Sequence, residues 1–513
     1  MGSPFPSFLR KGTEIKRQAD GSAVFPVFAA CLLCAAALRY YSFFPSVIDP
    51  DESLYLVMAQ HWLRGELPYK AVWDHHSVGL PALFAAIQAL APNSIVAIRL
   101  SAAVAVAVAA TAIYFISRLI DRHYLPSVIA ASLYIAKTTR SWGFSANCEL
   151  YLNALIVPAM LLVLRQLRGR SRSTEADLYL GALLLGVGWQ VKQVILFETM
   201  LFFGGALVVV WPSPRRWRTL SIAAACCAFP SLLVLGYFYA NGLLDEYLRA
   251  VVLSNLVYAG DSASLGEILH RIPRYYIAFS LFSTLVAASL IFRQKQREAF
   301  FVLLWAVASW MDVVLPGKYW PHYLILALPA TCILIGYLVT FAREMGWHRR
   351  FPRLAAVSVL VLATMAINPL GLYREIQRVD ARAQDDVPRT VAHEIKSQLT
   401  AADYVFAVDY QPVIYWLTAA HLPTSHVFPM DWSPLFADAT GVKPLQELEL
   451  VFSLRPRFVV VTDKNLIGLD DKTREVLGRY LSSYQVQLEI RDNQSMGKPV
   501  VVSVYRRKSS SGP

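Results

Sequence analysis

The stretch Val47–His76 reads VIDPDESLYLVMAQHWLRGELPYKAVWDHH and places three carboxylates directly after a long apolar segment. The apolar segment is Val24–Val47, which is long enough to enter a bilayer, and the carboxylates are Asp49, Asp51 and Glu52. Aromatic and charged residues follow them closely. The sequence therefore predicts a cluster of acids held at a membrane surface.

The overall composition indicates a polytopic membrane protein. Hydrophobic residues make up 56% of the chain and charged residues only 16%, and the mean hydropathy is +0.43. Apolar runs long enough to span a bilayer recur from residue 24 to about 372. The net charge is +12, but Lys and Arg gather in short gaps between these runs, so no nucleic-acid partner is expected. The first 20 residues are polar, so Val24–Val47 is expected to act as an uncleaved anchor.

The basic gaps predict the topology. Placing all of them on the cytoplasmic side requires about eleven spans. Leu80–Ala91 would form a helix of only about 18 Å, so it is expected to lie in the outer interface, like the amphipathic stretch Ser53–Leu63. The expected spans are 24–45, 96–119, 124–140, 150–167, 177–191, 193–211, 218–240, 271–292, 298–315, 321–341 and 353–372.

This topology predicts a membrane domain and an outer domain. The membrane domain covers residues 1–373 and carries an outer-face loop at 46–95. The other loops with candidate functional residues are expected on the same face. Residues 374–507 read as a soluble α/β domain, and 508–513 as a disordered tail. The domain's expected strands are Tyr404–Val408, Arg457–Thr462, Gln485–Ile490 and Val500–Tyr505, and its expected helices are Arg389–Leu399, Lys443–Leu454 and Lys472–Ser483.

The acids of the first outer loop are candidates for catalysis. Asp51 could simply cap the helix that begins near Ser53, because acids favour a helix N-terminus. Capping accounts for one or two of the three acids and leaves at least one without a role. Crowding of like charges should raise the pKa of at least one of these carboxyl groups toward a value useful to a general base. Glu149 is a further candidate, since it enters an apolar run at its outer mouth.

Basic and aromatic residues on the same face could bind a substrate. Snorkelling at helix ends is the alternative for each cation, and a membrane belt is the alternative for the aromatic residues. The six cysteines show no metal spacing and no disulfide framework, so no metal ligands are predicted among them. The candidates for binding a phosphate are Arg99, Lys192, Arg274 and Lys318, and those for lining a substrate pocket are Tyr55, Tyr69, Trp73, His322 and Tyr323.

The Val47–His76 stretch resembles the first outer loop of GT-C membrane glycosyltransferases of the protein O-mannosyltransferase-like and aminoarabinose-transferase-like group. The family's acidic pair falls on Asp51 and Glu52, its second-loop acid on Glu149, and its Lys-Gln on Lys192 and Gln193. Relatives carry Lys-Pro-Pro after the Trp-Asp pair, whereas here Asp74 is followed by two histidines. Further similar stretches are IVAIRLSAA, SANCELYLNAL, VKQVILFE, NGLLDEYLRAVVLSNLVYAG, KYWPHYLILALPA and DYVFAVDYQPVIYWLTAAHLPTSHVF.

The resemblance implies a GT-C fold and an inverting transfer from a polyprenyl-phosphate sugar on the outer face of a bacterial inner membrane. The acceptor would be a lipid, a glycan or a protein. Asp51 is the expected general base, and cations such as Lys192 would stabilise the departing phosphate. An activated lipid phosphate needs no nucleotide, which agrees with the lack of a P-loop motif in the sequence. No cofactor is certain, although a divalent metal could assist.

Two other functional classes compete with this interpretation. A lipid flippase or transporter would show internal repeats and Gly- or Pro-broken helices with charges near the midplane. Neither pattern is evident, and transport does not require a large outer domain. A purely structural assembly protein would leave the surplus acid without a role.

Overall fold

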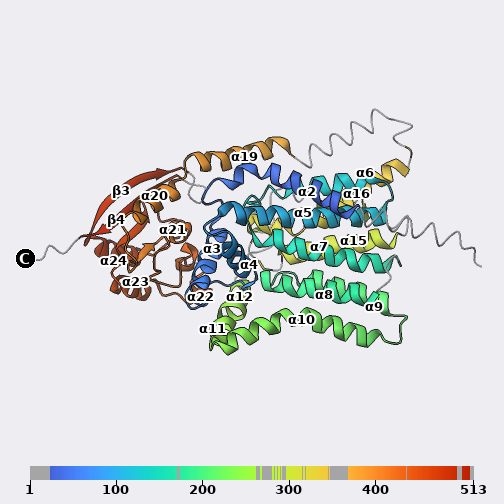
Figure 1. Cartoon of the computed structure of the whole chain (residues 1–513), viewed down its shortest axis with the longest axis horizontal. Coiled ribbons are helices and arrows are strands. Elements are labelled where there is room, and N and C mark those ends of the chain that lie inside the picture. Colours follow the sequence, from blue (N-terminus) through green and yellow to red (C-terminus); the bar gives the residue numbers. More distant parts are fainter. Residues whose placement is uncertain are drawn as a thin grey trace, which may run out of the picture.

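The computed structural model consists of a helical bundle joined at one end to a smaller domain of mixed helices and strands (Figure 1). The bundle lies on the right in this view, and the strands of the smaller domain lie on the left. The structure describes residues 23–169, 174–260, 266–267, 280–281, 283–285, 287–288, 291, 296–314, 316–317, 319–344, 346, 368–434, 436–493 and 499–508.

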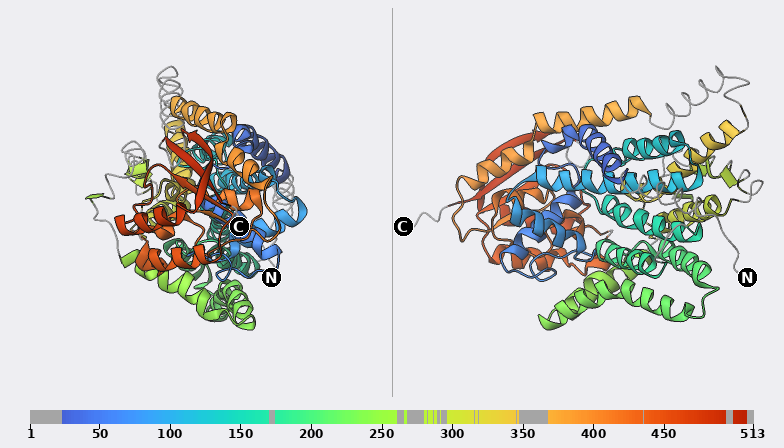
Figure 2. Two further views of the ribbon diagram at one scale, coloured as in Figure 1. Left: turned by 90° about the vertical axis from the view of Figure 1, so that its left-hand side faces the viewer. Right: turned by 45° about the vertical axis from the view of Figure 1, so that its right-hand side comes forward.

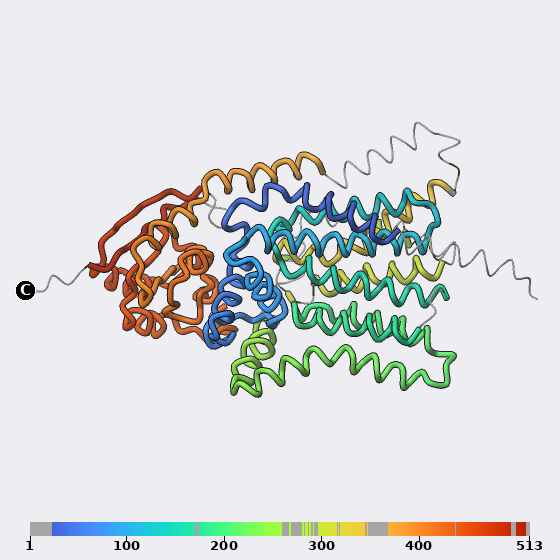
Figure 3. Tube along the Cα trace, viewed as in Figure 1, coloured from blue at the N-terminus to red at the C-terminus, as the bar shows by residue number. Residues whose placement is uncertain are grey.

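Long apolar helices make up the bundle and run side by side along its length (Figures 1 and 3). Four described helices are long and apolar enough to cross a membrane, namely Ile95–Ile120, Cys148–Leu167, Arg216–Ala240 and Pro321–Arg343. The chain is therefore a multi-pass membrane protein. The bundle helices are α2 (Val24–Leu38), α5 (Ile95–Ile120), α6 (Tyr124–Lys137), α7 (Cys148–Leu167), α8 (Thr174–Val191), α9 (Leu196–Val210), α10 (Arg216–Ala240), α15 (Arg297–Val314) and α16 (Leu328–Glu344).

Most of the expected spans coincide with helices, with two differences. The first helix ends at Leu38 and is followed by the short 3-10 helix η1 (Tyr40–Phe43), so it is shorter than the expected span 24–45. Most of 271–292 and most of 353–372 lie outside the described residues. The count of about eleven spans therefore stays a prediction.

Small residues let the bundle helices approach one another. A Cβ on Gly186 of α8 would lie 2.2 Å from the carbonyl oxygen of Cys227 on α10, so only glycine permits this crossing. Alanines that are fully or almost fully buried, among them Ala102, Ala103 and Ala109, do the same along α5. By contrast, α10 lies at the edge of the bundle in Figures 1 and 2, and only 11% of its most apolar stretch is buried. Its remaining surface is suited to lipid.

Two short helices of the first outer loop pack between the bundle and the smaller domain. They are α3 (Pro50–Leu63) and α4 (Gly79–Leu90). The expectation that Ser53–Leu63 lies in the membrane interface is wrong, because every residue of α3 from Glu52 to His61 is buried. Two hydrogen bonds join this layer to α21 (Val413–Thr418) of the smaller domain: the Gln60 amide donates to the carbonyl of Trp416 at 3.2 Å, and the Trp416 indole donates to Gln88 at 2.9 Å.

The smaller domain is built on a four-stranded mixed sheet in the order β1-β2-β4-β3. Its strands β1 (Val405–Ala407), β2 (Phe458–Thr462), β3 (Tyr484–Asp492) and β4 (Val500–Arg507) all lie at the predicted places. So do the helices α20 (Val387–Lys396), α23 (Pro444–Ser453) and α24 (Asp471–Leu481). The elements that were not predicted are α19 (Pro369–Gln384), α21, η4 (Pro429–Trp432) and α22 (Ala437–Thr440).

The smaller domain connects to the bundle through α19, which runs unbroken through the expected boundary between residues 373 and 374. A further group of short helices, α11 (Leu244–Leu248), η2 (Arg249–Leu253) and α12 (Ser254–Gly260), follows α10. The helix α12 packs against α22 of the smaller domain. The outer loop, α12, α19 and the smaller domain therefore surround one region at the end of the bundle (Figure 1).

Candidate active site

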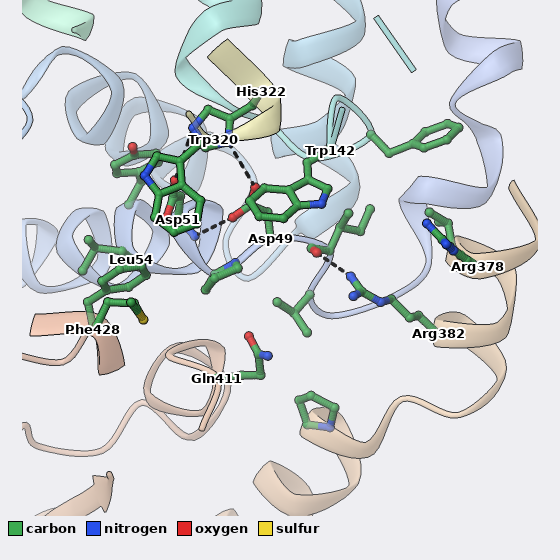
Figure 4. Close-up of a pocket in the computed structure, with 18 of the residues that line it drawn as sticks. Asp49, Asp51, Leu54, Trp142, Trp320, His322, Arg378, Arg382, Gln411 and Phe428 are labelled. Atoms are coloured by element: carbon green, nitrogen blue, oxygen red, sulfur yellow. Dashed lines mark hydrogen bonds and ion pairs between the residues drawn. The ribbon is translucent and has the colours of Figure 1, made fainter. Parts of the chain in front are cut away.

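A cavity of about 880 Å³ lies where the bundle, the first outer loop and the smaller domain meet. Its lining combines the start of α3, the loop after Trp73, the residue Lys192 between α8 and α9, and one side of α19. The smaller domain contributes residues such as Gln411 and Phe428 (Figure 4). The cavity is therefore formed by segments from most of the chain length.

Asp49 and Asp51 lie in the wall of this cavity and have different surroundings (Figure 4). Asp49, rather than Asp51, caps α3: its Oδ1 accepts from the amide of Asp51 at 3.0 Å, and its Oδ2 accepts from Asn147 at 3.1 Å. The side chain of Asp51 makes no such cap and is 27% exposed, whereas that of Asp49 is almost fully buried. Asp51 is thus the acid that a molecule in the cavity could reach.

Both carboxyl groups bind protons more tightly than usual. Burial raises the pKa of Asp49 to about 6, against its hydrogen bonds from Asp51 and Asn147. Burial, followed by the charge on Asp49, raises the pKa of Asp51 well above its usual value. Perturbed carboxyl pairs of this kind are common where proton transfer takes place.

Glu52 and Arg99 form a buried clamp outside the cavity lining. Arg99 donates to both carboxylate oxygens of Glu52, with Nη2 at 2.7 Å from Oε1, and also to the carbonyls of Ser42 and Pro45. The other partner of Glu52 is the amide of Ala146 at 2.7 Å. Because these contacts hold the start of α3 against α5, they favour a structural role over the predicted catalytic role of Glu52 and phosphate contact of Arg99.

Lys192 lines the cavity and is paired with Glu149. Its Nζ lies 2.7 Å from Oε1 of Glu149 and 4.0 Å from the centre of the Tyr323 ring. Burial alone would lower the pKa of Lys192, but the Glu149 carboxylate more than offsets this effect and raises it. The ion pair therefore holds the positively charged Lys192 side chain in one position in the cavity lining. Glu149 is fully buried and does not line the cavity.

His322 lies close to both aspartates of the first outer loop and to Glu149. Its Nε2 lies 4.0 Å from Oδ2 of Asp51 and 3.9 Å from Oε1 of Glu149, and its Nδ1 lies 4.0 Å from Oδ2 of Asp49. The Nδ1 atom is buried and has no hydrogen-bond partner among the described residues. His322 and Tyr323 both line the cavity, and their role in binding a substrate stays a prediction.

Two clusters contain groups able to bind a metal ion. The ligand atoms of Asp49, Asp51 and His322 lie within 4.8 Å of one another, and so do those of a second set made of Asp74, His75 and His76. Carboxylate oxygens combined with imidazole nitrogens suit divalent ions such as Zn²⁺ or Mn²⁺. The unpartnered Nδ1 of His322 fits such an ion as well, although the sequence predicted no metal ligands.

The Asp-His-His turn is a part of the site that sequence reasoning did not select. Nδ1 of His76 lies 2.9 Å from Oδ1 of Asp74, and both residues line the cavity together with His75. The other oxygen of Asp74 is buried without a hydrogen-bond partner among the described residues. Three adjacent ionisable residues in an outer loop are the signal that could have identified this turn.

The remaining predicted residues divide into three groups. Tyr55 lines the cavity. Tyr69 and Trp73 lie outside its lining: Tyr69 donates to the carbonyl of His76 at 2.9 Å, and the Trp73 ring lies 5.5 Å from that of His426. Their prediction as pocket residues is not supported, since both pack against neighbouring side chains. Arg274 and Lys318 lie outside the described residues.

Arginines of α19 form a part of the wall that the sequence did not reveal. Arg374, Arg378 and Arg382 recur at every fourth position, so they share one face of the helix, and all three line the cavity. Figure 4 shows Arg378 and Arg382 extending from α19, with Arg382 bonded to the carbonyl of Ile48 beside Asp49. The four-residue spacing could have identified this face, but the predicted domain boundary at 373/374 separated it from the membrane site.

The fold is that of the GT-C membrane glycosyltransferases, as the resemblance in the sequence implied. The structure is similar to ArnT from Cupriavidus metallidurans bound to undecaprenyl phosphate, with a TM-score of 0.60 and 14% identity over 94% of this chain and 99% of ArnT. The apo state of the same ArnT gives a TM-score of 0.59 at 14% identity, over 95% of this chain and 98% of ArnT. No protein-family model and no curated protein matches the sequence.

Proposed function

We propose that this protein is a membrane glycosyltransferase that transfers a sugar from a polyprenyl-phosphate donor to an acceptor of the cell envelope, with inversion at the anomeric carbon. The observation that carries the proposal is the partly exposed carboxylate of Asp51 in a cavity that also holds the fixed charge of Lys192. The overall similarity to ArnT, which is bound to undecaprenyl phosphate in one structure, supports the choice of donor.

The proposed step needs a base and a site for a leaving phosphate. Asp51 accepts the proton of the acceptor hydroxyl while the oxygen attacks the anomeric carbon, and the bond from that carbon to the phosphate oxygen breaks. The lipid phosphate then leaves with an additional negative charge. His322, 4.0 Å from Asp51, is placed to influence the proton on this carboxylate.

Cations of the wall would stabilise the leaving phosphate. Glu149 balances part of the charge of Lys192, so further cations are needed to offset the charge of the phosphate. Arg378 and Arg382 on α19 add positive charge to the same cavity. A divalent ion held by Asp49, Asp51 and His322 would supply further charge stabilisation.

The test is transfer by the purified full chain with a panel of undecaprenyl-phosphate sugars and an envelope-lipid extract as acceptor. Formation of a glycosylated product together with undecaprenyl phosphate supports the proposal. Mass spectrometry of envelope glycolipids in a deletion strain then identifies the acceptor. Parallel assays with EDTA and with added Mn²⁺ show whether a divalent ion is required.

The alternative of a flippase or transporter makes a different prediction. A transporter would move the intact lipid-linked sugar across a proteoliposome membrane without breaking its phosphate bond. The absence of cleavage together with movement of the intact donor would replace the proposed function with this one.

A further inference from the structure

A second, smaller cavity lies beside the main one, where α19 begins next to the loop after α6. Its volume is about 370 Å³, and its lining includes Arg140, Asn368, Gly371, Arg374 and Arg378. Arg374 and Arg378 also line the main cavity, so the two spaces are neighbours along α19. We propose that this side cavity binds the phosphate group of an anionic membrane lipid, a ligand beyond the substrates of the proposed reaction.

Glu375, an acid that also lines the side cavity, balances only part of the positive charge of the arginines there. Glu375 pairs with Arg378 at 3.0 Å. Among the described residues, no carboxylate lies within 4.0 Å of the Arg140 or Arg374 guanidinium. The Nη1 atom of Arg140 is buried and has no hydrogen-bond partner in the described part of the chain. A buried guanidinium nitrogen without a hydrogen-bond acceptor destabilises the folded protein unless a bound anion accepts its hydrogen bond.

A second cation behind the cavity increases this imbalance. Arg39 is only 1% exposed, and its hydrogen-bond partners among the described residues are all uncharged: the backbone and hydroxyl oxygens of Thr138 and the carbonyl of Gly143. Two of its nitrogens, Nε and Nη1, have no hydrogen-bond partner among the described residues. The segment that carries Arg140 is therefore also contacted by Arg39, a second arginine without an acidic partner among the described residues, which favours binding of an anion.

The backbone of α19 leaves room for the Arg140 guanidinium. A Cβ on Gly371 would lie 2.2 Å from Nη1 of Arg140, so the absence of a side chain at this position allows the guanidinium to lie against α19. The side chain of Asn368 accepts from the amide of Gly371 at 3.2 Å and fixes the first turn of the helix. Planar guanidinium groups bind phosphate oxygens in pairs, so two converging arginines match a phosphate better than a single carboxylate.

Exposed aromatic and apolar side chains around the cavity favour a lipid over free phosphate. Leu370 and Tyr373 of α19 are 60% and 57% exposed, and Tyr40 of η1, which packs against α19, is 56% exposed. Aromatic residues of this kind mark the headgroup region of a bilayer. We therefore expect the arginines to lie near the depth of the lipid phosphates, and arginines near an anionic surface attract such lipids.

The experiment measures lipid binding to the full chain by native mass spectrometry in detergent. Phosphatidylglycerol, phosphatidylcholine and inorganic phosphate are added in separate titrations. We expect tight adducts with phosphatidylglycerol only, and affinity about 10- to 30-fold weaker in the double variant Arg140→Gln/Arg374→Gln. The control variant Arg249→Gln removes an exposed arginine on η2, away from this cavity, and should bind as the wild type does.

A second variant keeps every charge and changes only the space. Gly371→Ala places a methyl group against Arg140 within a helix that favours alanine, so it should fold and still lose the lipid. Unchanged phosphatidylglycerol binding in both the double variant and Gly371→Ala would overturn the proposal. Binding of inorganic phosphate without preference for phosphatidylglycerol over phosphatidylcholine would overturn the assignment to a lipid.

Discussion

The Nζ atom of Lys192 lies 2.7 Å from Oε1 of Glu149, and both side chains are almost completely buried. Lys192 belongs to the cavity lining, whereas Glu149 lies beneath it and does not face the cavity. The pair therefore links the substrate-facing surface to the packing of α7 against the loop between α8 and α9. Removing either partner should affect stability and binding together.

Lys192→Ala should lower stability as well as transfer. It leaves the Glu149 carboxylate buried without its partner, which costs about 3 kcal/mol or more. The double variant Lys192→Met/Glu149→Gln should recover most of the lost thermal midpoint, because neither buried charge remains, yet it should keep a raised donor KM. Recovery of both quantities in the double variant would show that Lys192 acts only in packing.

Asp51→Asn should abolish transfer without affecting folding. Loss of a general base costs about 100- to 10,000-fold in rate, and the partly exposed side chain of Asp51 caps no helix. The rate of sugar transfer and the thermal midpoint are measured on the same preparation. Asp49→Asn should lose less activity, because Asp49 is buried. Near-wild-type transfer by Asp51→Asn would exclude it as the base.

Asp49 should make stability depend on pH between about 4 and 6. Its pKa in the folded protein is about 6, above the usual value of 3.8. The folded state therefore holds the proton more tightly than the unfolded state, and the stability from Asp49 is full below pH 3.8 and is lost as the pH rises through 6.

Asp49→Asn should remove this loss of stability at higher pH, because an amide does not ionise. The start of α3 should be kept, since asparagine also caps helices. Compared with the wild type, the variant should gain up to about 3 kcal/mol between pH 4 and pH 8. Thermal midpoints measured across this range test the difference. Parallel curves for the two proteins would show that Asp49 does not titrate there.

The sidedness of the cavity can be tested by cysteine labelling in a background from which the six native cysteines are removed. A cysteine at the exposed position Ser483 in the smaller domain should react with an impermeant maleimide added outside intact cells. A cysteine at Arg215, between α9 and α10, should react only after the cells are opened. The reverse pattern would place the cavity on the cytoplasmic side and exclude an outer-face reaction.

Local sequence patterns were enough to predict most elements of the fold. Apolar runs locate the bundle helices because a bilayer-spanning helix must be apolar over its own length. Apolar strands such as Phe458–Thr462 and capped helices such as Asp471–Leu481 also follow from neighbouring residues. The burial of α3 did not follow from neighbouring residues. The stretch was predicted to be amphipathic, whereas the helix is buried on all sides by partners distant in sequence.

The sequence by itself determined that this chain crosses a membrane and carries acids, cations and aromatic residues on connecting loops. Only the tertiary structure decided their partners. Glu52 pairs with Arg99, 47 positions away in the sequence, and Glu149 pairs with Lys192, 43 positions away. As a result Arg99 is buried outside the cavity lining, whereas Lys192 is held in it. Arginines of α19 share the cavity with the acids at the start of α3 because α19 joins the smaller domain to one end of the bundle (Figure 1). Charge pairing depends on which surfaces pack together, and no local spacing encodes that choice.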